Sequence, residues 1–508
     1  MNRVNVLDFD DHVLERIINY ISKRQNLALT CKRFYAAICR VEKYEMKLLI
    51  ESATLEDCYE SIMNSRRQFN EFQLDAKALS SDNVYVISSL KLFGDNITKA
   101  NVNYLTSKDS LSFLKHLIKL EHLEMLFTKT DAEYQKDDET ENFFRIKNLH
   151  VNSRDGVPDI FHLFTHGVLD NVIIEIKNFN KDLDKFWATQ PNIKKLKGNF
   201  ISLRQMECLK LEEFISTNCN IDVSEVVNFL KSQPNLIKLE LEACVKESQL
   251  QIFPNLLLEN LNNLQILNIC FEELSFELMI SLTKLKNLKE LSLQIFEDDF
   301  DVSVLTSVVF SNLRKLFLEI SETSITREFL NKLKSSFPCL KVLSLRTDMP
   351  LILYELLNIF CEIETVAIDL WDQLAIGDFF HPNVDKNYKN LTELHFTFSG
   401  KRFPISCMNN LINKNFLPNL QIIKFDGLSQ ITFNEEFHLW IKNLPKVQLL
   451  IIKNIKIEDE DFDISEKLNK IKNLDITFNC TCDHIEGIRN FLDEQFDGIK
   501  CKNFTIKK

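Results

Sequence analysis

Leucine and other large apolar residues recur along the chain in a short pattern whose three anchors are separated by three and then two positions. The clearest copy spans 234–244, and its anchors are Leu236, Leu239 and Leu241. Glu240 and Glu242 alternate with the last two of these leucines. This alternation predicts a short strand with one buried face. Further copies begin at 263, 287, 312 and 339, and weaker copies begin at 363, 390, 419 and 447.

These copies recur with a nearly constant period, because the mean interval between their first anchors is about 26 residues. This spacing and period are typical of leucine-rich repeats, and the segment 234–455 resembles that family. Stretches between the strands, such as 224–232 and 326–336, carry apolar residues at helical spacing. We therefore expect an α/β fold, a leucine-rich-repeat solenoid in which each repeat is one strand and one helix. Parallel strands would form the inner wall of a right-handed horseshoe and helices its outer wall.

The same pattern divides the chain. It becomes regular at 146, so residues 146–508 are predicted to form the main solenoid. Residues 51–145 carry the spacing at irregular intervals, which predicts divergent early repeats. Their segment 131–141 has no apolar anchor and predicts an exposed acidic loop. Residues 1–50 do not follow the period and are predicted to form a small all-α domain.

These first fifty residues carry a second resemblance. The sequences FDDHVLERIINYIS at 9–22 and NLALTCKRFYAAI at 26–38 are similar to the F-box, a helical motif that binds the Skp-type adaptor of SCF (cullin–RING) ubiquitin ligases. Asp10 stands where the family usually has proline, and the loop between the first two helices is shorter than usual. A plain helical cap over the first repeat is the alternative interpretation. The positions that the resemblance implies for adaptor binding are Phe9, Val13, Leu14, Ile17, Ile18, Leu27, Leu29, Cys31 and Phe34.

Composition narrows the range of partners. The chain has 508 residues and a net charge of −12, which disfavours binding to nucleic acid or to an anionic membrane. No apolar run is long enough to span a membrane, and the first residues turn acidic at once, so we expect a cytoplasmic or nuclear protein. The 13 cysteines are scattered and odd in number, which predicts reduced and mostly buried thiols.

The sequence lacks the common catalytic motifs. Phosphate-binding glycine loops and the zinc-protease and serine-hydrolase motifs do not occur. Cys480, Cys482 and His484 alternate along one stretch, but a fourth ligand is missing and the spacing is tighter than in zinc sites. We therefore expect no catalytic residue, no metal and no cofactor.

The residues between and after the last two anchors of each strand are expected to face the hollow of the horseshoe. These positions are mixed in polarity and lack a basic stripe, which favours a protein ligand over nucleic acid. An inert, solvated wall is the alternative that periodicity leaves open. The predicted target-binding residues are Glu240, Glu242, Asn268, Ser292, Gln294, Phe317, Glu319, Arg346, Asp369, His395, Lys424 and Asp426.

Together, the two resemblances imply a non-catalytic substrate-recognition subunit of an SCF ubiquitin ligase. Its F-box would bind the Skp-type adaptor, and its repeats would bind a target protein that the sequence does not identify. The alternative is a leucine-rich-repeat scaffold or inhibitor that clamps a partner without any attached ligase.

Overall fold

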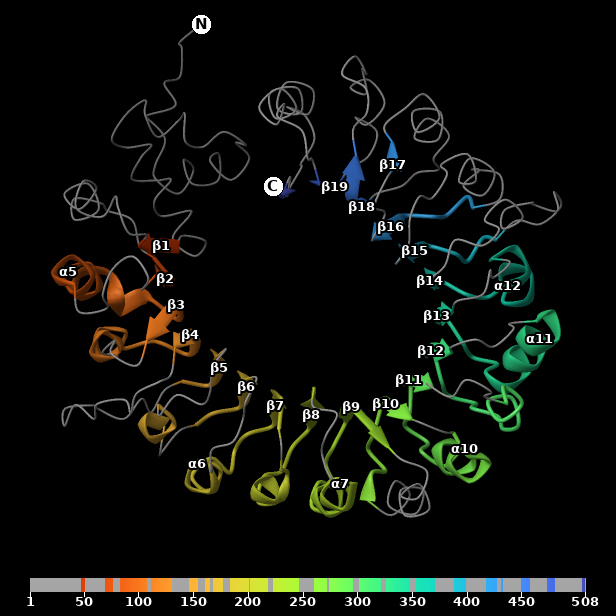
Figure 1. The fold of residues 1–508 in the computed structure, drawn as a ribbon, viewed down its shortest axis with the longest axis horizontal. Helices are drawn as coiled ribbons and strands as arrows, with labels where there is room; N and C mark the ends of the chain where they lie inside the picture. The colour runs from red at the N-terminus through yellow and green to blue at the C-terminus, as the bar shows by residue number, and fades with distance from the viewer. Residues whose placement is uncertain are drawn as a thin grey trace, which may run out of the picture. The chain divides into compact units, whose positions relative to one another are not determined.

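The computed structural model is a succession of parallel strands joined by helices and turns (Figure 1). The predicted F-box residues, the segment 131–141 and the group Cys480, Cys482 and His484 lie outside the described residues. The chain divides into two compact units, 1–236 and 237–508. The described residues are 47–50, 69–75, 83–106, 111–129, 146–153, 160–164, 168–176, 183–200, 202–217, 223–245, 260–271, 274–295, 301–320, 326–347, 353–370, 388–398, 417–426, 431–432, 449–456, 473–479 and 505–507.

The first unit contains one sheet whose described strands all run parallel and lie in chain order. Neighbouring parallel strands require a crossover connection between them, so each strand with its connection is one repeat. The strands are β1 (Lys47–Ile50), β2 (Glu71–Asp75), β3 (Lys99–Thr106), β4 (His122–Lys129), β5 (Asn148–Ser153), β6 (Asn171–Ile176), β7 (Lys195–Gly198) and β8 (Glu213–Ser216).

The second unit repeats this arrangement, again with parallel strands in chain order, and a two-residue strand, β17 (Ile431–Thr432), pairs beside the last residues of β18. The predicted parallel leucine-rich-repeat fold is confirmed. The other strands of this unit are β9 (Lys238–Val245), β10 (Ile266–Phe271), β11 (Glu290–Ile295), β12 (Lys315–Ile320), β13 (Val342–Thr347), β14 (Thr365–Leu370), β15 (Glu393–Phe398), β16 (Ile422–Asp426), β18 (Leu449–Lys456), β19 (Asn473–Asn479) and β20 (Thr505–Lys507).

The connecting helices lie on one side of the sheet in each unit (Figure 1). Several start at a side-chain cap that their sequence supplies: the Thr326 hydroxyl accepts a hydrogen bond from the Phe329 N–H at the start of α11. The α-helices are α5 (Val84–Phe93), α6 (Asp184–Ala188), α7 (Val223–Lys231), α10 (Phe276–Thr283), α11 (Arg327–Ser336) and α12 (Leu353–Ile359). The 3₁₀ helices are η2 (Gly94–Asn96), η3 (Ser112–His116), η4 (Phe161–Phe164) and η5 (Arg204–Met206).

The connections between the described strands are not all α-helical. Between β7 and β8, Lys195 pairs with Glu213 only 18 residues later, and this interval contains the short η5 instead of an α-helix. Between β11 and β12, residues 302–308 form turns. That stretch is rich in β-branched residues such as Val302 and Val304, which lose side-chain freedom in a helix.

The anchor residues of the pattern form continuous buried rows. In β12, Leu316 and Leu318 are buried, whereas Phe317 between them is exposed. Each fully buried leucine contributes about 1.5–3 kcal/mol of transfer free energy, so the row is a main source of stability for the stacked repeats. The row that contains Leu316 runs from β11 to β16, and each of its side chains is 0% exposed. Its members are Leu291, Leu316, Leu343, Val366, Leu394 and Ile423.

Asparagines that precede the first leucine of the pattern tie each repeat to the one before it. The Asn312 side-chain amide donates to the Lys286 carbonyl at 3.0 Å, and Asn287 donates to the Asn262 carbonyl at 2.9 Å. Asn419 makes the equivalent bond to the Lys389 carbonyl at 2.7 Å. These bonds set the stacking of neighbouring repeats, and they explain why asparagine recurs at this position.

The expectation of mostly buried cysteines is wrong among those that the structure describes. Cys270 is buried, but Cys208, Cys339 and Cys361 are exposed. Cys339 and Cys361 lie in the turns that precede β13 and β14, one residue before the anchor Leu340 and two residues before the anchor Ile363. A residue in the turn before the first anchor is exposed whatever its type, because the apolar anchor that follows it occupies the buried position.

Candidate protein-binding surface

The face of each sheet opposite the helices carries the residues that alternate with the buried anchors. In the second unit the strand register aligns these residues in two rows. The first row runs across the strands as Glu240, Asn268, Ser292, Phe317, Ser344, Ala367, His395 and Lys424. The second row runs as Gln294, Glu319, Arg346, Asp369, Thr397 and Asp426.

The structure therefore places most of the predicted target-binding residues side by side. Asp426 joins the second row by its backbone register, and its side chain lies outside the described part. Glu242 does not join a row, because the pairing of β9 with β10 shifts beyond Leu241 and leaves Glu242 in an irregular stretch, where it is exposed. A strand irregularity of this type does not follow from periodicity.

A depression of about 230 Å³ lies at the centre of these rows. Phe317 forms one side of it and is 38% exposed, which is unusual for a phenylalanine on a strand. Its partners in register on both sides are serines, Ser292 and Ser344, and Ala367 follows on the next strand. A large aromatic ring beside small side chains leaves room next to the ring for a group from another molecule.

The second row beside this depression holds an arginine between two carboxylates. Arg346 Nη1 lies 3.0 Å from Glu319 Oε1, and Arg346 Nε lies 3.2 Å from Asp369 Oδ2. The Glu319 and Asp369 side chains are 15% and 24% exposed. One guanidinium faces two carboxylates, so the group carries a net charge of about −1 when all three are ionised.

His395 lies farther along the first row, in surroundings that favour its neutral form. Its Nε2 is 3.3 Å from Glu393 Oε2. Burial lowers the pKa of His395, and the charge of Lys424 lowers it further, while Glu393 acts in the opposite direction. The imidazole contributes a half-buried ring to the surface.

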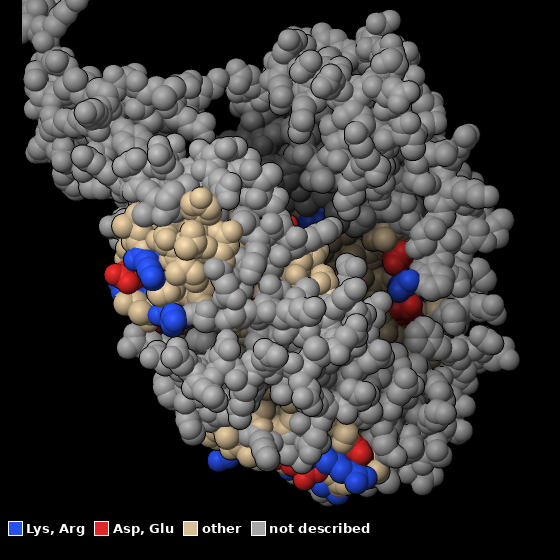
Figure 2. Space-filling model, turned by 60° about the vertical axis from the view of Figure 1, so that its left-hand side comes forward, with Lys and Arg blue, Asp and Glu red and all other residues tan. Residues whose placement is uncertain are grey.

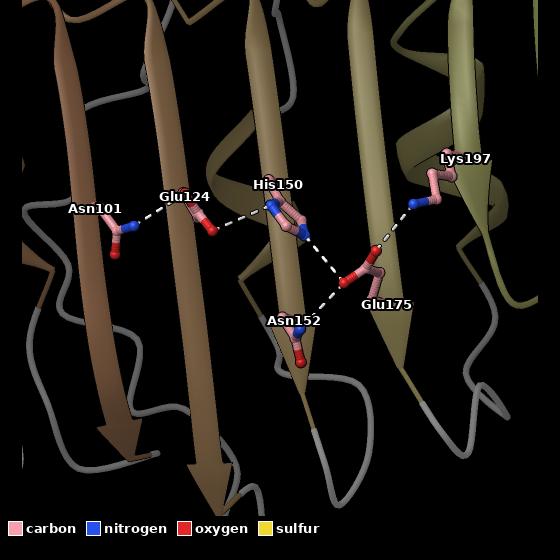
Figure 3. Close-up of polar contacts among 6 residues, drawn as sticks. All are labelled: Asn101, Glu124, His150, Asn152, Glu175 and Lys197. Atoms are coloured by element: carbon pink, nitrogen blue, oxygen red, sulfur yellow. Dashed lines mark hydrogen bonds and ion pairs between the residues drawn. The ribbon is translucent and has the colours of Figure 1, made fainter. Parts of the chain in front are cut away.

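The first unit has its own polar network on the equivalent face (Figure 3). Asn101 on β3 donates to Glu124 on β4 at 2.9 Å, and Glu124 Oε1 lies 3.4 Å from His150 Nδ1 on β5. The other ring nitrogen of His150 lies 3.4 Å from Glu175 Oε2 on β6. Lys197 Nζ on β7 is 3.2 Å from Glu175 Oε1. These contacts connect five successive strands.

This network borders a second depression, of about 190 Å³, lined in part by Glu124 and His150. Burial raises the pKa of Glu175, but the hydrogen bond from Lys197 and the charges of Lys197 and His150 outweigh it, so the pKa lies below its ordinary value. Glu175 is therefore ionised across the physiological range, and the network keeps charged groups fixed at defined positions on the face.

These residues of the first unit were not among the predicted site residues. His150, Ile173 and Lys197 occupy the position between the last two anchors of their strands, which is the position used for the second unit. Applying the same rule to the weaker copies at 146–151, 169–174 and 193–198 would have identified all three.

Charges of both signs are interspersed over the described surface. Figure 2 shows lysine and arginine side chains next to aspartate and glutamate side chains in small groups. Typical pairs join neighbouring repeats, such as Lys315 with Glu290 at 2.6 Å and Lys341 with Glu364 at 3.3 Å. Such a surface gives directional contacts to a protein partner without a large field of one sign.

Two kinds of site are absent from the described part of the chain. No three side chains among its histidines, cysteines, aspartates and glutamates converge in a way that could hold a metal ion. None of its helices has the length and apolar content that crossing a membrane would require.

Comparison with known proteins gives likenesses at the level of solved structures. No family model matches the chain, and no curated protein matches it significantly. The internalin InlF of Listeria monocytogenes is 13% identical over 90% of this chain and 96% of its own, with a TM-score of 0.29. Rad7, solved with Elc1 from yeast, is 14% identical over 66% of this chain and 87% of its own, with a TM-score of 0.36. LegL7 of Legionella pneumophila, a leucine-rich-repeat protein, is 12% identical over 59% of this chain and 91% of its own, with a TM-score of 0.29.

Three features of the structure define its architecture: the register of the strands, the buried leucine rows and the asparagine hydrogen bonds between repeats. The chain has a leucine-rich-repeat fold, and the helix-free faces of its sheets are its candidate binding surface.

Proposed function

We propose that this chain is the non-catalytic substrate-recognition subunit of an SCF-type ubiquitin ligase, in the cytoplasm or nucleus. In this proposal, residues 9–38 bind the Skp-type adaptor and the repeats bind a target protein. The observation that carries the proposal is the order of the two segments, an F-box-like sequence directly in front of a leucine-rich-repeat array. The registered side chains on the helix-free face support the second half of it.

The mechanism would be proximity. A receptor that holds the adaptor at one end and the target at another raises the effective concentration of target lysines near the ubiquitin-charged enzyme, typically to the millimolar range for short, flexible links. The bond-forming steps would belong to the partner enzymes, and this chain would contribute position and orientation.

Co-purification of the intact chain with a Skp-type adaptor tests the adaptor half of the proposal. Ile17→Asp and Leu27→Asp would each place a charge in the apolar contact, and we expect each to weaken adaptor binding by about tenfold or more. Val309→Asp is the matched control, because Val309 is 57% exposed and far from the F-box-like segment in the sequence. Unchanged adaptor binding in both F-box variants would refute the assignment.

The scaffold alternative rests on two departures from the F-box pattern: Asp10 at the position where the family usually has proline, and the shortened loop between the first two helices. If the native chain fails to bind any adaptor while its repeats still bind a protein partner, this alternative is correct. The two outcomes are distinguished in a single co-purification experiment, because adaptor and target would be detected separately.

A further inference from the structure

Two asparagines of the first unit lie side by side on the helix-free face, and their side chains make no hydrogen bond to any described residue. Asn148 on β5 and Asn171 on β6 are partners in register, and both line the depression of about 190 Å³. Both residues are half-buried. Polar groups that are removed from water normally have a hydrogen-bond partner, and leaving them without one costs free energy. The pair therefore offers hydrogen-bonding groups that the described chain itself does not use.

Comparable positions elsewhere in the sheets are satisfied within the chain. Each asparagine of the pair directly precedes the second anchor of its repeat. At this position of β7 and β8, Lys195 and Glu213 form an ion pair. Glu290 and Lys315 form the same kind of pair between β11 and β12. Two uncharged carboxamides in place of such a pair leave donors and acceptors at the depression.

Carboxamides of this kind fit the main chain of another polypeptide. Each one offers N–H donors and an oxygen acceptor without a charge, and a peptide group presents the complementary C=O and N–H. The charged residues that line the depression have both signs, with Lys99 together with Glu71 and Glu124, so they give no preference for a ligand of one charge. The volume lies below the roughly 300–1,000 Å³ that is usual for small-molecule pockets. The depression therefore suits part of a chain rather than a whole small molecule.

We propose that this depression binds an extended segment of a target protein through the main chain of that segment, with Asn148 and Asn171 as the two contacts. The inference rests on the proposed target-binding role of the repeats, and it specifies which groups of the target are recognised. Neighbouring strands lie about 4.8 Å apart. In an extended segment, the C=O of one residue and the N–H two residues later point to the same edge at a spacing of roughly 4–5 Å. One carboxamide therefore donates to that C=O while the other accepts from that N–H.

The surroundings of the two asparagines are fixed before a segment binds. Glu124 accepts a hydrogen bond from Asn101 at 2.9 Å and lies 3.4 Å from His150, and all three residues line the depression (Figure 3). Groups that are already held in place lose little conformational freedom on binding, which favours affinity. Ile173 lies two residues after Asn171 on β6 and also lines the depression, where it provides an apolar contact for one side chain of the segment.

Peptides with a modified main chain test the inference on the intact protein. A library of short synthetic peptides is screened for binding, and the best binder is the probe. Each main-chain amide of the probe is then replaced in turn by an ester, which removes the N–H donor and keeps the shape of the chain nearly unchanged. We expect one such replacement to weaken binding about tenfold. Equal binding of all the ester peptides, or a library without any binder, would overturn the inference.

Variants of the protein show whether the probe uses the two asparagines. Asn148→Leu and Asn171→Leu keep the approximate size of the side chain but remove its hydrogen-bonding groups, and each is expected to weaken binding about tenfold. Neither is expected to lower the Tm, because neither side chain loses a hydrogen bond to a described residue, whereas a structural role would lower it. Asn96→Leu is the matched control, because Asn96 is an exposed asparagine of η2, on the connection between β2 and β3. Equal losses of binding in all three variants would overturn the assignment of the site.

Combining the two sets of changes shows whether the contact is direct. In the variant that lacks the accepting carboxamide, the critical ester replacement is expected to weaken binding much less than it does in the native protein. Additive losses in both asparagine variants would contradict a direct contact with the main chain.

This test separates the inference from the ligase proposal. Ile17→Asp is expected to leave peptide binding unchanged, and Asn148→Leu is expected to leave adaptor binding unchanged. A native chain that binds adaptor but selects no peptide would refute the main-chain site alone. A native chain that selects peptides through the two asparagines but binds no adaptor would refute the ligase assignment alone.

Discussion

Leu316 and Phe317 are neighbours in β12 with opposite environments, and alanine substitution of each tests the assignment of the two sheet faces. Leu316 is 0% exposed and lies between Leu291 and Leu343, which are also fully buried. Its truncation leaves a cavity that solvent cannot fill, so Leu316→Ala is expected to cost about 3 kcal/mol. Phe317 is 38% exposed, and Phe317→Ala is expected to cost about 1 kcal/mol, because much of its ring already contacts water.

Native-state hydrogen exchange of the β11–β13 amides measures these costs locally, which suits a long repeat protein that does not unfold in one step. A loss of 3 kcal/mol corresponds to exchange that is faster on the order of 100-fold, and a loss of 1 kcal/mol corresponds to about fivefold. Equal effects of the two substitutions, or a larger effect of Phe317→Ala, would refute the assignment of Leu316 to the buried face of β12 and of Phe317 to the helix-free face.

Three further predictions concern single residues. Gly198→Ala is expected to destabilise β6 and β7 by roughly 1–3 kcal/mol and to lower the Tm, because a Cβ there would lie 2.6 Å from the Ile174 carbonyl oxygen; an unchanged Tm would contradict this contact. Thr326→Ala is expected to cost about 1 kcal/mol by removing the cap of α11, whereas Thr326→Ser should keep most of it, as measured by exchange of the α11 amides. Burial and the charge of Lys424 lower the pKa of His395 in the folded chain. As the pH falls below the ordinary value of 6.5, His395 is therefore protonated in the unfolded chain before it is protonated in the folded chain. Stability is therefore expected to fall as the pH drops through the lowered pKa, and this part of the pH dependence should be absent in His395→Gln; an identical profile in the variant would show that His395 is not responsible.

The periodic part of the fold could be predicted from the sequence because burial imposes it directly. Leu239, Leu291 and Leu316 are the equivalent anchors of three repeats, and each is fully buried in a parallel strand. The face opposite the helices followed from the same alternation, so Phe317 and Arg346 were correctly expected to share a surface.

Features that depend on neighbouring repeats could not be predicted in this way. Glu242 leaves its row because β9 and β10 change register beyond Leu241, and register depends on both strands together. The contacts of His150 with Glu124 and Glu175 join residues from three repeats, and no local pattern marks them. The F-box assignment of residues 9–38 and the target-binding roles stay predictions, because they concern partners.

A double-mutant cycle between Glu319 and Arg346 tests the central structural claim, that stacked leucine repeats bring distant residues together on one face. The two side chains approach to 3.0 Å only if β12 and β13 pair in the observed register. We predict that the effects of Glu319→Gln and Arg346→Gln on the opening free energy of β12 and β13, measured by amide exchange, differ from additivity by roughly 0.5–3 kcal/mol. The control pair combines Arg346→Gln with Glu328→Gln on α11, and its effects are expected to add. Additive effects of the Glu319 and Arg346 substitutions would contradict the register and the binding surface built on it.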